Sequence, residues 1–366
     1  MKKVNKIVHL VSNKEWGGGE QYVYDLCSHL IEQGYPVELF IRPVEQVAKR
    51  MQQLGIPIHK ARLGGVPDIA SAAKLATYLK QQKEERITIH AHNFKDAFTA
   101  AYARLLSGKK NIRIVVTRHL VREAKHSFLY RRLYKQIDCI IFVSELAKEA
   151  FLKTAPAIDG SRLKVVKNSI CIPDKITAID CRKALSLPTD SVVTMYHGRL
   201  AEEKGIGVLL QAIARLQHKN ISLVLIGRSD EKYATTIQNI IKEYKLERKI
   251  FFAGYQSPVF PWLGSCDIGV LPSTVAESSS LACMEYMACG RAIVTTNHGG
   301  QAEYLTDQRN ALLVPPNDVE ALAAAINTLI DNTELRKALG YKAQADFEKN
   351  LSYSRFLQQI EDIYDR

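Results

Sequence analysis

Two glutamates, Glu277 and Glu285, lie eight residues apart on either side of a run of three serines at 278–280. Serine is a good N-cap residue, and the apolar residues that follow, up to the stop at Gly290, predict a helix that contains Glu285. A helix N-terminus favours a phosphate, and a carboxylate accepts hydrogen bonds from hydroxyl groups. A diphosphate between two diol-bearing rings, as in a nucleotide-sugar, fits this pattern. The alternative is two solvated glutamates beside a core helix.

A second pair of charged residues, Arg199 and Lys204, lies between Gly198 and Gly205, directly after an apolar run at 192–196. Arginine offers a planar fork for phosphate oxygens, and lysine offers a point charge. Both could stabilise the negative charge that develops on a diphosphate as a sugar–phosphate bond breaks. The alternative is a glycine-bounded turn with two surface bases.

Three glycines, Gly17 to Gly19, follow the first apolar run and precede a predicted helix. Glycines at such a position let backbone N–H groups approach a phosphate or a sugar closely. The segment is neither the Gly-x-Gly-x-x-Gly fingerprint nor a Walker loop. A tight turn explains it equally well.

Four histidines, His90, His92, His119 and His298, lie at the ends of predicted strands. Metal binding needs convergent ligands, which a His-x-His pair does not establish. We therefore predict no metal site, a structural role for His90, and a neutral hydrogen-bond donor to sugar hydroxyls at His119.

Apolar, β-branched runs alternate with amphipathic helices twice along the chain, which is typical of parallel sheets covered on both faces. The predicted strands are 6–11, 37–41, 87–91, 113–117, 139–143 and 163–166, then 192–196, 222–226, 250–253, 268–271 and 292–295. The predicted helices are 21–32, 69–82, 97–106, 145–153, 206–217, 231–244, 281–289 and 319–331, with two more after residue 334. The rhythm breaks at 168–191, where prolines and aspartates indicate a linker and a short helix.

The length of 366 residues favours two domains. The apolar run at 7–11 is too short for a signal sequence or a membrane span. The seven cysteines form no Cys-x-x-Cys pair, so we expect buried thiols in a reducing compartment. The expected location is the cytoplasm.

The net charge of +12 is uneven: residues 1–175 hold 30 Lys/Arg against 16 Asp/Glu. Between Arg104 and Lys135, ten bases face one acid, with Phe128, Leu129 and Leu133 among them, so part of this segment is predicted to be a basic amphipathic helix. It fits an anionic membrane surface, and the protein would then be peripheral on the cytoplasmic face. Nucleic acid and a solvated face without a partner are the alternatives, although aromatics at helical spacing argue against nucleic acid.

Together these motifs resemble glycosyltransferase family 4. The similarity rests on Gly198-Arg199-x4-Lys204-Gly205, on Glu277-x7-Glu285 with Ala288-Cys-Gly290, on Gly299-Gly300-x-x-Glu303, and on Gly17-Gly18-x-Glu20. The motifs occur in order along nearly the whole chain. The resemblance implies the GT-B fold: an α/β architecture of two Rossmann-like, doubly wound parallel-sheet domains facing a cleft.

The expected N-terminal acceptor-binding domain spans 1–172, joined by a C-terminal helix at 352–366, and the expected nucleotide-sugar donor domain spans 173–351. The family implies retaining transfer from a nucleotide-diphosphate sugar without a cofactor or an obligatory metal. By the same resemblance Arg199 and Lys204 bind the diphosphate, Glu285 binds the ribose, Glu277 contacts the donor sugar, and His119, in Thr117-x-His119, lies beside the transferred sugar. The substrate-binding set implied is Gly17, Gly18, Gly198, Arg199, Lys204, Gly227, Glu277, Ser278, Ser279, Ser280, Leu281 and Glu285.

This sequence departs from the family pattern at two places. After the first glutamate, family members often carry an aromatic residue or a serine and then a glycine, whereas this chain has three serines at 278–280. Asn168-Ser169 stands where the family usually has Asn-Gly. The expected function is transfer of a sugar to a glycan or lipid-linked acceptor in cell-surface polysaccharide or glycolipid synthesis. A catalytically silent nucleotide-sugar binding protein and a nucleotide-sugar epimerase of the same fold are the alternatives.

Overall fold

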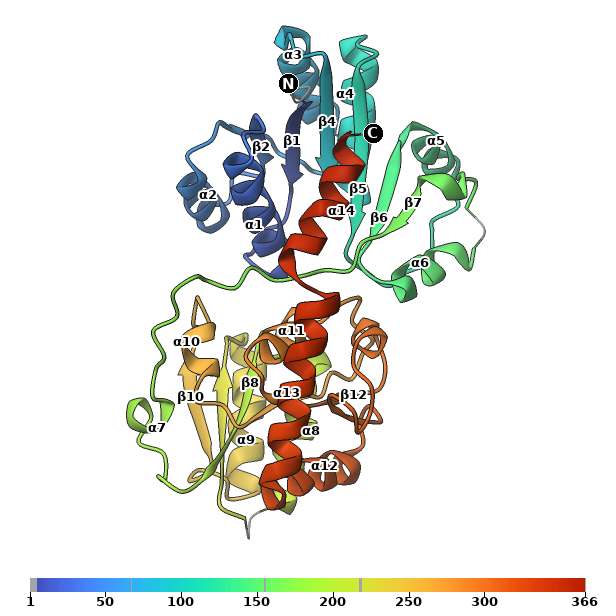
Figure 1. Ribbon diagram of the computed structural model, residues 1–366. Coiled ribbons are helices and arrows are strands. Elements are labelled where there is room, and N and C mark those ends of the chain that lie inside the picture. The colour runs from blue at the N-terminus through green and yellow to red at the C-terminus, as the bar shows by residue number, and fades with distance from the viewer. Residues whose placement is uncertain (1–4, 67, 155, 217–218, 366) are drawn as a thin grey trace. The chain divides into compact units, whose positions relative to one another are not determined.

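The computed structural model describes residues 5–66, 68–154, 156–216 and 219–365 (Figure 1). The chain divides into two compact units: Met1–Asn168 with Ser354–Arg366 form the first, and Ser169–Tyr353 form the second. Each unit has its own buried apolar core. The two-sheet α/β architecture predicted from the alternating pattern is confirmed.

The first unit is built on a parallel sheet with the strand order β3-β2-β1-β4-β5-β6-β7. Its inner strands are buried on both faces because helices cover them, which explains their continuous apolar runs. Figure 1 shows these strands in blue to green. The strands are β1 (Asn5–Val11), β2 (Val37–Ile41), β3 (Ile58–Lys60), β4 (Arg86–Ala91), β5 (Ile112–Arg118), β6 (Cys139–Phe142) and β7 (Leu163–Val165); the helices are α1 (Gly18–Glu32), α2 (Glu45–Met51), α3 (Ile69–Gln81), α4 (Phe94–Ser107), α5 (Phe128–Gln136) and α6 (Glu145–Leu152).

The last helix, α14 (Tyr353–Asp365), belongs to the first unit although it ends the chain. Asn5 Nδ2 donates a hydrogen bond to the Tyr364 carbonyl at 2.9 Å, and the Phe356 ring packs edge-on against Tyr22. The red helix beside the blue and green sheet in Figure 1 is this element. The predicted return of the C-terminal helix to the first domain is confirmed.

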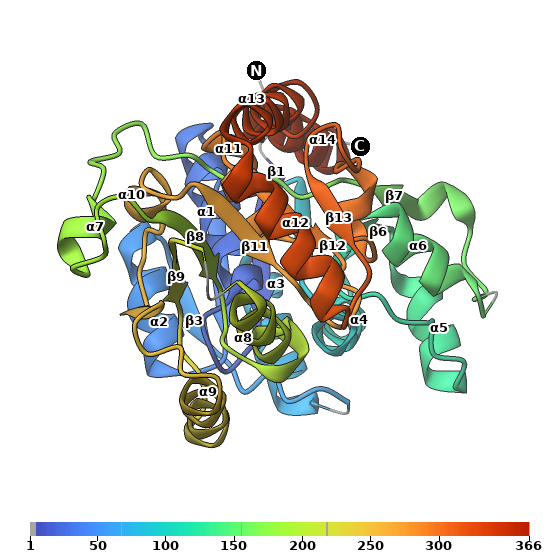
Figure 2. The same ribbon diagram turned by 90° about the horizontal axis from the view of Figure 1, so that it is seen from below.

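The second unit carries a parallel sheet with the order β10-β9-β8-β11-β12-β13. Helices α8 and α12 pack together, and α11 packs on α13 (Figure 2). The strands are β8 (Val192–His197), β9 (Ile221–Ile226), β10 (Ile250–Gly254), β11 (Ile268–Leu271), β12 (Ala292–Thr296) and β13 (Leu312–Val314); the helices are α7 (Cys181–Ala184), α8 (Ile206–Arg215), α9 (Glu231–Glu243), α10 (Phe260–Leu263), α11 (Leu281–Ala288), α12 (Val319–Asp331) and α13 (Thr333–Asn350).

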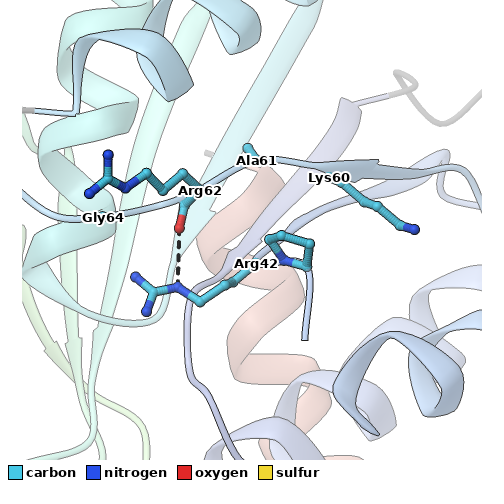
Figure 3. A pocket seen from close by; sticks show the side chains of 6 residues that line it. Arg42, Lys60, Ala61, Arg62 and Gly64 are labelled. Carbon is cyan, nitrogen blue, oxygen red and sulfur yellow. Dashed lines mark hydrogen bonds between the residues drawn. The ribbon is translucent and has the colours of Figure 1, made fainter. Parts of the chain in front are cut away.

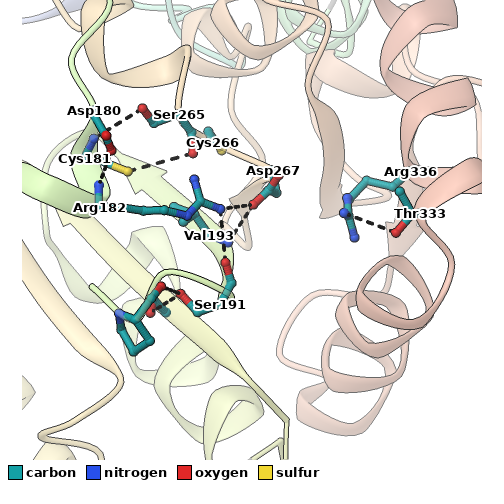
Figure 4. A network of polar contacts seen from close by, with 12 residues as sticks. Asp180, Cys181, Arg182, Ser191, Val193, Ser265, Cys266, Asp267, Thr333 and Arg336 are labelled. Atoms are coloured by element: carbon teal, nitrogen blue, oxygen red, sulfur yellow. Dashed lines mark hydrogen bonds and ion pairs between the residues drawn. The ribbon is translucent and has the colours of Figure 1, made fainter. Parts of the chain in front are cut away.

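The segment before β8 is attached to the second sheet by a polar network (Figure 4). Arg182 donates to the Ser191 carbonyl at 3.1 Å and to Asp267 at 3.0 Å, and the same carboxylate oxygen accepts the Val193 N–H. The short helix predicted in the linker is therefore docked on its own domain. Ser169, which stands where glycine was expected, has no positive φ among the described backbone angles and hydrogen-bonds the Leu351 carbonyl instead.

The expectation of buried thiols is correct for five cysteines and wrong for Cys171, which is exposed. Cys289 is half-buried. Cys171 lies in the irregular stretch between β7 and α7, where no sheet or helix face covers it.

Candidate functional site

One residue of the second predicted charge pair, Lys204, contacts one of the two glutamates. Lys204 Nζ lies 3.0 Å from Glu277 Oε1, with side chains that are 25% and 19% exposed. Ser273 Oγ donates a hydrogen bond to the same Glu277 oxygen. Lys204 ends a short 3-10 helix, η3 (Glu202–Lys204), that follows β8, whereas Glu277 follows β11. Because β8 and β11 are neighbouring parallel strands, both residues emerge at the carboxyl edge of the sheet.

The other glutamate, Glu285, is held by a residue that the sequence analysis missed. Its Oε2 lies 2.5 Å from Nε2 of His197, the last residue of β8. Ser280 caps α11 as predicted, since its side chain accepts the Cys283 N–H. The position of His197, directly before the Gly198-Arg199 turn, was the available signal for its role.

Arg199 is not part of this cluster. Its side chain is 61% exposed and pairs with Glu203, four residues along the chain. The guanidinium is thus held near the strand end by a surface ion pair, which is a weak contact that a phosphate can replace.

Two glycines let the strand ends approach each other backbone to backbone. A Cβ on Gly227, whose φ is +152°, would lie 1.8 Å from the Gly198 carbonyl oxygen. A Cβ on Gly205, whose φ is +72°, would lie 1.9 Å from the Pro272 carbonyl oxygen. The predicted glycines Gly198 and Gly227 are therefore in direct contact, after β8 and β9 respectively, and no larger residue fits at 227 or 205.

Two half-buried residues close to Glu277, in the chain or in space, carry buried polar atoms that have no partner within the described part of the chain. Among the described residues, Ser279 Oγ and both ring nitrogens of His298 have no hydrogen-bond partner. His298 precedes Gly299, whose Cβ would lie 2.9 Å from the Glu277 backbone nitrogen. Buried polar atoms in folded proteins are normally paired. These atoms are therefore available to a ligand, although His298, one of the four histidines at predicted strand ends, was not among the residues expected to bind it.

In the first unit, the glycine loop opens α1 as predicted, with Gly17 as its N-cap. The Gly17 N–H donates to Glu20 Oε2 at 3.0 Å, and Asn13 donates to the other Glu20 oxygen. Burial raises the pKa of Glu20, while these hydrogen bonds oppose the shift. The N–H of Gly17 is therefore engaged within the protein, which leaves the first turn of α1, beginning at Gly18, for ligand contacts.

His119 follows β5 and lies among aromatic rings. Its ring packs edge-on against Tyr22 at 5.0 Å and is stacked on His92 at 6.0 Å between ring centroids. The surrounding protein desolvates the imidazole and lowers the pKa of His119 to about 4. The side chain is therefore neutral near pH 7, which is the charge state expected of His119.

His9, His90 and His92 each place one ring nitrogen within 4.8 Å of the others. Among the described residues, these three are the group whose spacing could hold a metal ion. Both nitrogens of His90 are used, by Tyr364 Oη at 2.6 Å and Thr117 Oγ1 at 2.7 Å, and His9 Nδ1 lies 3.0 Å from His92 Nε2. Burial lowers the pKa values of all three. The two hydrogen bonds of His90 tie α14 to the sheet, which is a structural contact of the kind expected of this residue, whereas His9 Nε2 and His92 Nδ1 are buried without a hydrogen-bond partner among the described residues.

Only some of the basic side chains between Arg104 and Lys135 are free of contacts within the described part of the fold. Arg104 pairs with Asp138, Arg113 bonds the Ile363 carbonyl, and Arg118 lies over the rings of Phe94 and Phe151. These bases stabilise the fold. The predicted amphipathic helix is α5, together with the loop before it.

Helix α5 exposes both apolar and basic side chains. Phe128 and Leu129 are 68% and 47% exposed, and Arg132 lies over the Phe128 ring at 4.8 Å. Arg131 and Lys135 are also exposed. None of the described helices is long and apolar enough to cross a membrane.

Comparison with known proteins identifies the class. Residues 16–172 match the family model described as Glycosyltransferase Family 4, and residues 179–346 match the model described as Glycosyl transferases group 1. The chain therefore belongs to glycosyltransferase family 4, and its two parallel-sheet domains are those of the GT-B fold.

Individual relatives span nearly the whole chain. The lipopolysaccharide core biosynthesis glycosyltransferase LpsE of Rhizobium meliloti is 25% identical over 358 residues, which cover 91% of each protein. A glycosyltransferase from Rickettsia africae has a similar structure, with a TM-score of 0.86 at 19% identity over 98% of this chain and 97% of its own. Anabaena Alr3699/HepE in complex with UDP gives a TM-score of 0.84 at 20% identity over 98% and 99%, and it has also been solved with UDP-glucose. These structures share the fold of this chain.

Proposed function

We propose that this glycosyltransferase moves a hexosyl group from a nucleotide-diphosphate sugar to a glycan or lipid-linked acceptor, with retention of configuration, in cell-surface polysaccharide or glycolipid synthesis. The observation that carries the proposal is the contact of Lys204 with Glu277 at the carboxyl edge of the second sheet. There a cation and a carboxylate lie between the start of α11 and the close-packed glycine turns. The proposed role in cell-surface polysaccharide synthesis is further supported by the similarity to a lipopolysaccharide core biosynthesis glycosyltransferase.

Each polar group has a distinct part in this reaction. Lys204 and Arg199 stabilise the negative charge on the diphosphate as the sugar–phosphate bond breaks. Glu285, oriented by His197, accepts hydrogen bonds from the ribose hydroxyls. Glu277 accepts them from the donor sugar, beside the uncommitted Ser279 Oγ and the N-terminus of α11.

His119 and the loop at Gly17 and Gly18 complete the proposal in the first unit. A neutral His119 imidazole donates to a sugar hydroxyl without carrying charge into the site. The proposed reaction has no obligatory metal and no cofactor, because two cationic side chains and a helix N-terminus can bind the diphosphate.

The test is release of nucleoside diphosphate on addition of acceptor. UDP-glucose, followed by other UDP-, GDP- and ADP-sugars, is incubated with a lipid-linked oligosaccharide extract, with and without EDTA, and the anomeric configuration of the product is read by NMR. We expect acceptor-dependent release that survives EDTA and a product with the donor's configuration. Inversion, or abolition of activity by chelation, would contradict the proposal.

The same assay separates the alternatives. A silent nucleotide-sugar binding protein would bind donor without releasing nucleotide, and an epimerase would interconvert sugars without an acceptor. The uncommitted Ser279 and His298 would then serve recognition alone.

We further propose that α5 attaches the enzyme to an anionic cytoplasmic membrane surface. Exposed Phe128 and Leu129 insert among headgroups, and Arg131, Arg132 and Lys135 contact them, each contributing about 1 kcal/mol. The positive charge of the exposed face of α5 is complementary to the negative charge of the lipid surface.

Vesicle co-sedimentation tests this attachment. Substitution of Arg131, Arg132 and Lys135 by serine should release the protein from vesicles containing phosphatidylglycerol, and raised salt should do the same, since salt screens such attraction within about 10 Å at 0.1 M. The matched control replaces three exposed lysines of the second unit, Lys232, Lys242 and Lys245, by serine. Equal sedimentation of both variants would exclude α5 as the membrane contact.

A further inference from the structure

A hollow of about 470 Å³ lies in the first unit, outside the residues assigned to the donor (Figure 3). Its volume is in the range of small-ligand sites. Three of its six lining residues are cationic, and none is acidic. The lining consists of Arg42, Pro43, Lys60, Ala61, Arg62 and Gly64.

Sheet topology explains why these cations gather. Strands β2 and β3 are parallel neighbours, with Ile41 paired to Lys60. Arg42 directly follows β2, and Arg62 follows β3 by two residues. The hollow therefore lies at the carboxyl edge of the first sheet, where open α/β sheets bind their ligands.

The guanidinium of Arg42 is held by backbone carbonyls of the loop that follows β3. Its Nε donates to the Arg62 carbonyl at 3.1 Å, and its Nη2 donates to the Leu63 carbonyl at 2.7 Å. A guanidinium has five N–H donors, so donors remain for a ligand. Figure 3 shows the side chains of Arg42 and Arg62 extending to the same side, with Lys60 extending the other way.

The loop that bears Arg62 is rigid and strained. Leu63 has a φ of +46°, which is rare for a residue other than glycine. Its N–H donates to Ser71 Oγ, and the next N–H, of Gly64, donates to Asp68 Oδ2 at 2.6 Å. Backbone strain of this kind persists where surrounding contacts over-determine it, commonly at ligand sites.

Among the residues that the structure describes, Arg42, Lys60 and Arg62 form no ion pair with a carboxylate. Asp68 is buried and accepts hydrogen bonds from Ser71 and Gly64. Burial tends to raise the pKa of Asp68, but hydrogen bonds from Gly64 and Ser71, together with the nearby Arg62 charge, lower it. Asp96, the other acid near Arg42, is also buried and hydrogen-bonded to Asn93.

We propose that this hollow binds a phosphate group of the acceptor, held by Arg42 and Arg62, with Lys60 as a third cation in the lining. The inference rests on the proposed function, because it assigns the acceptor a phosphate. Two arginines in reach of one anion favour a phosphate, which they can bind through several parallel N–H···O bonds. The phosphate belongs either to a phosphorylated sugar or to the diphosphate of a lipid-linked acceptor.

Calorimetric titration of the full chain tests the proposal with two inorganic probes. Saturating UDP first occupies the donor site, and phosphate or pyrophosphate is then added. A variant with Arg42, Lys60 and Arg62 replaced by glutamine should bind pyrophosphate at least about tenfold more weakly and should retain its affinity for UDP. Pyrophosphate binding well above phosphate binding indicates a lipid-linked diphosphate, and similar affinities indicate a single phosphate ester.

Two control variants distinguish loss of the pocket charges from a general loss of folding and from loss of charge elsewhere in the same unit. Arg62→Gln alone should weaken the probe several-fold, because the exposed Arg62 side chain makes no hydrogen bond with the described residues and its loss leaves the loop intact. Replacing Lys80, Lys83 and Lys110 by glutamine removes three exposed charges of the same unit and should change nothing beyond about twofold.

Two outcomes would overturn the inference: equal loss in the control triple variant, or unchanged pyrophosphate affinity in the pocket variants. Failure of the proposed function looks different. In that case the wild-type protein binds neither UDP nor any other nucleotide, while the pocket variant still loses the pyrophosphate binding that the wild type has. That result would support the anion site and refute the donor site.

Discussion

Replacement of Lys204 by methionine should lower turnover far more than it lowers stability. Methionine keeps the length of the side chain and removes the charge that we assign to the diphosphate. Loss of one electrostatic stabiliser of a transition state lowers turnover by at least about 100-fold, equivalent to about 2.7 kcal/mol. The free energy of unfolding should change less.

The stability change follows from the geometry of the ion pair. Lys204 and Glu277 are 25% and 19% exposed and lie 3.0 Å apart, and Ser273 still donates to Glu277 after the substitution. A pair that retains solvent contact contributes up to about 1 kcal/mol. In a domain of this size, a loss of that magnitude lowers the melting temperature by about 2–4 °C.

Lys219 provides the matched control in the same domain. Its Nζ lies 2.6 Å from Asp331, and it is 24% exposed, so Lys219→Met removes a similar ion pair away from the site. Initial rates of nucleotide release and melting curves are measured for both variants. Turnover of Lys204→Met within about fivefold of wild type, or an equal loss in Lys219→Met, would refute the assignment of Lys204.

Three further predictions follow from other contacts. Glu285→Ala should weaken calorimetric binding of free nucleoside diphosphate by at least about tenfold, whereas Glu277→Ala should lower turnover and largely spare that affinity; equal losses would contradict the division of roles. Gly205→Ala should lower the free energy of unfolding in urea by several kcal/mol, because the added Cβ would clash with the Pro272 carbonyl. In the control Gly207→Ala, the nearest atom to the added Cβ is 3.7 Å away, so the change should be neutral or stabilising by up to about 1 kcal/mol. Equal urea midpoints for the two variants would exclude a steric cause. Burial raises the pKa of Asp96 to about 7, so the native state holds a proton that the unfolded chain releases near pH 4, and stability should fall as pH rises from about 4 through 7. Asp96→Asn should flatten that slope in unfolding titrations, and an unchanged slope would refute the buried neutral acid.

The alternation of strands and helices could be predicted because it depends on local periodicity. Apolar β-branched runs such as the one in β9 are buried on both faces, and the helix at α12 begins and ends at the predicted residues. Strands β3 and β13 escaped prediction because three residues with mixed burial carry no period. Helix α2 was missed as well, and its seven residues are too few for a clear pattern.

The motifs also singled out Lys204, Glu277 and Glu285 as candidate site residues, because glycines at turns and charged residues are visible in the chain itself. Their partners were not visible. The contact of Lys204 with Glu277 and that of His197 with Glu285 exist because β8 lies beside β11, and strand order is a long-range property that no local spacing records.

Charge shows the same division between sequence and tertiary structure. The excess of bases in residues 1–175 is a fact of composition, but the structure assigns Arg104 and Arg113 to internal contacts and brings Arg42 and Arg62 together around a hollow. The sequence by itself determined which elements form and which residue types their ends carry, because both depend on neighbouring residues. Only the tertiary structure decided which of those ends meet, because side-by-side packing of distant strands sets the distances between charges.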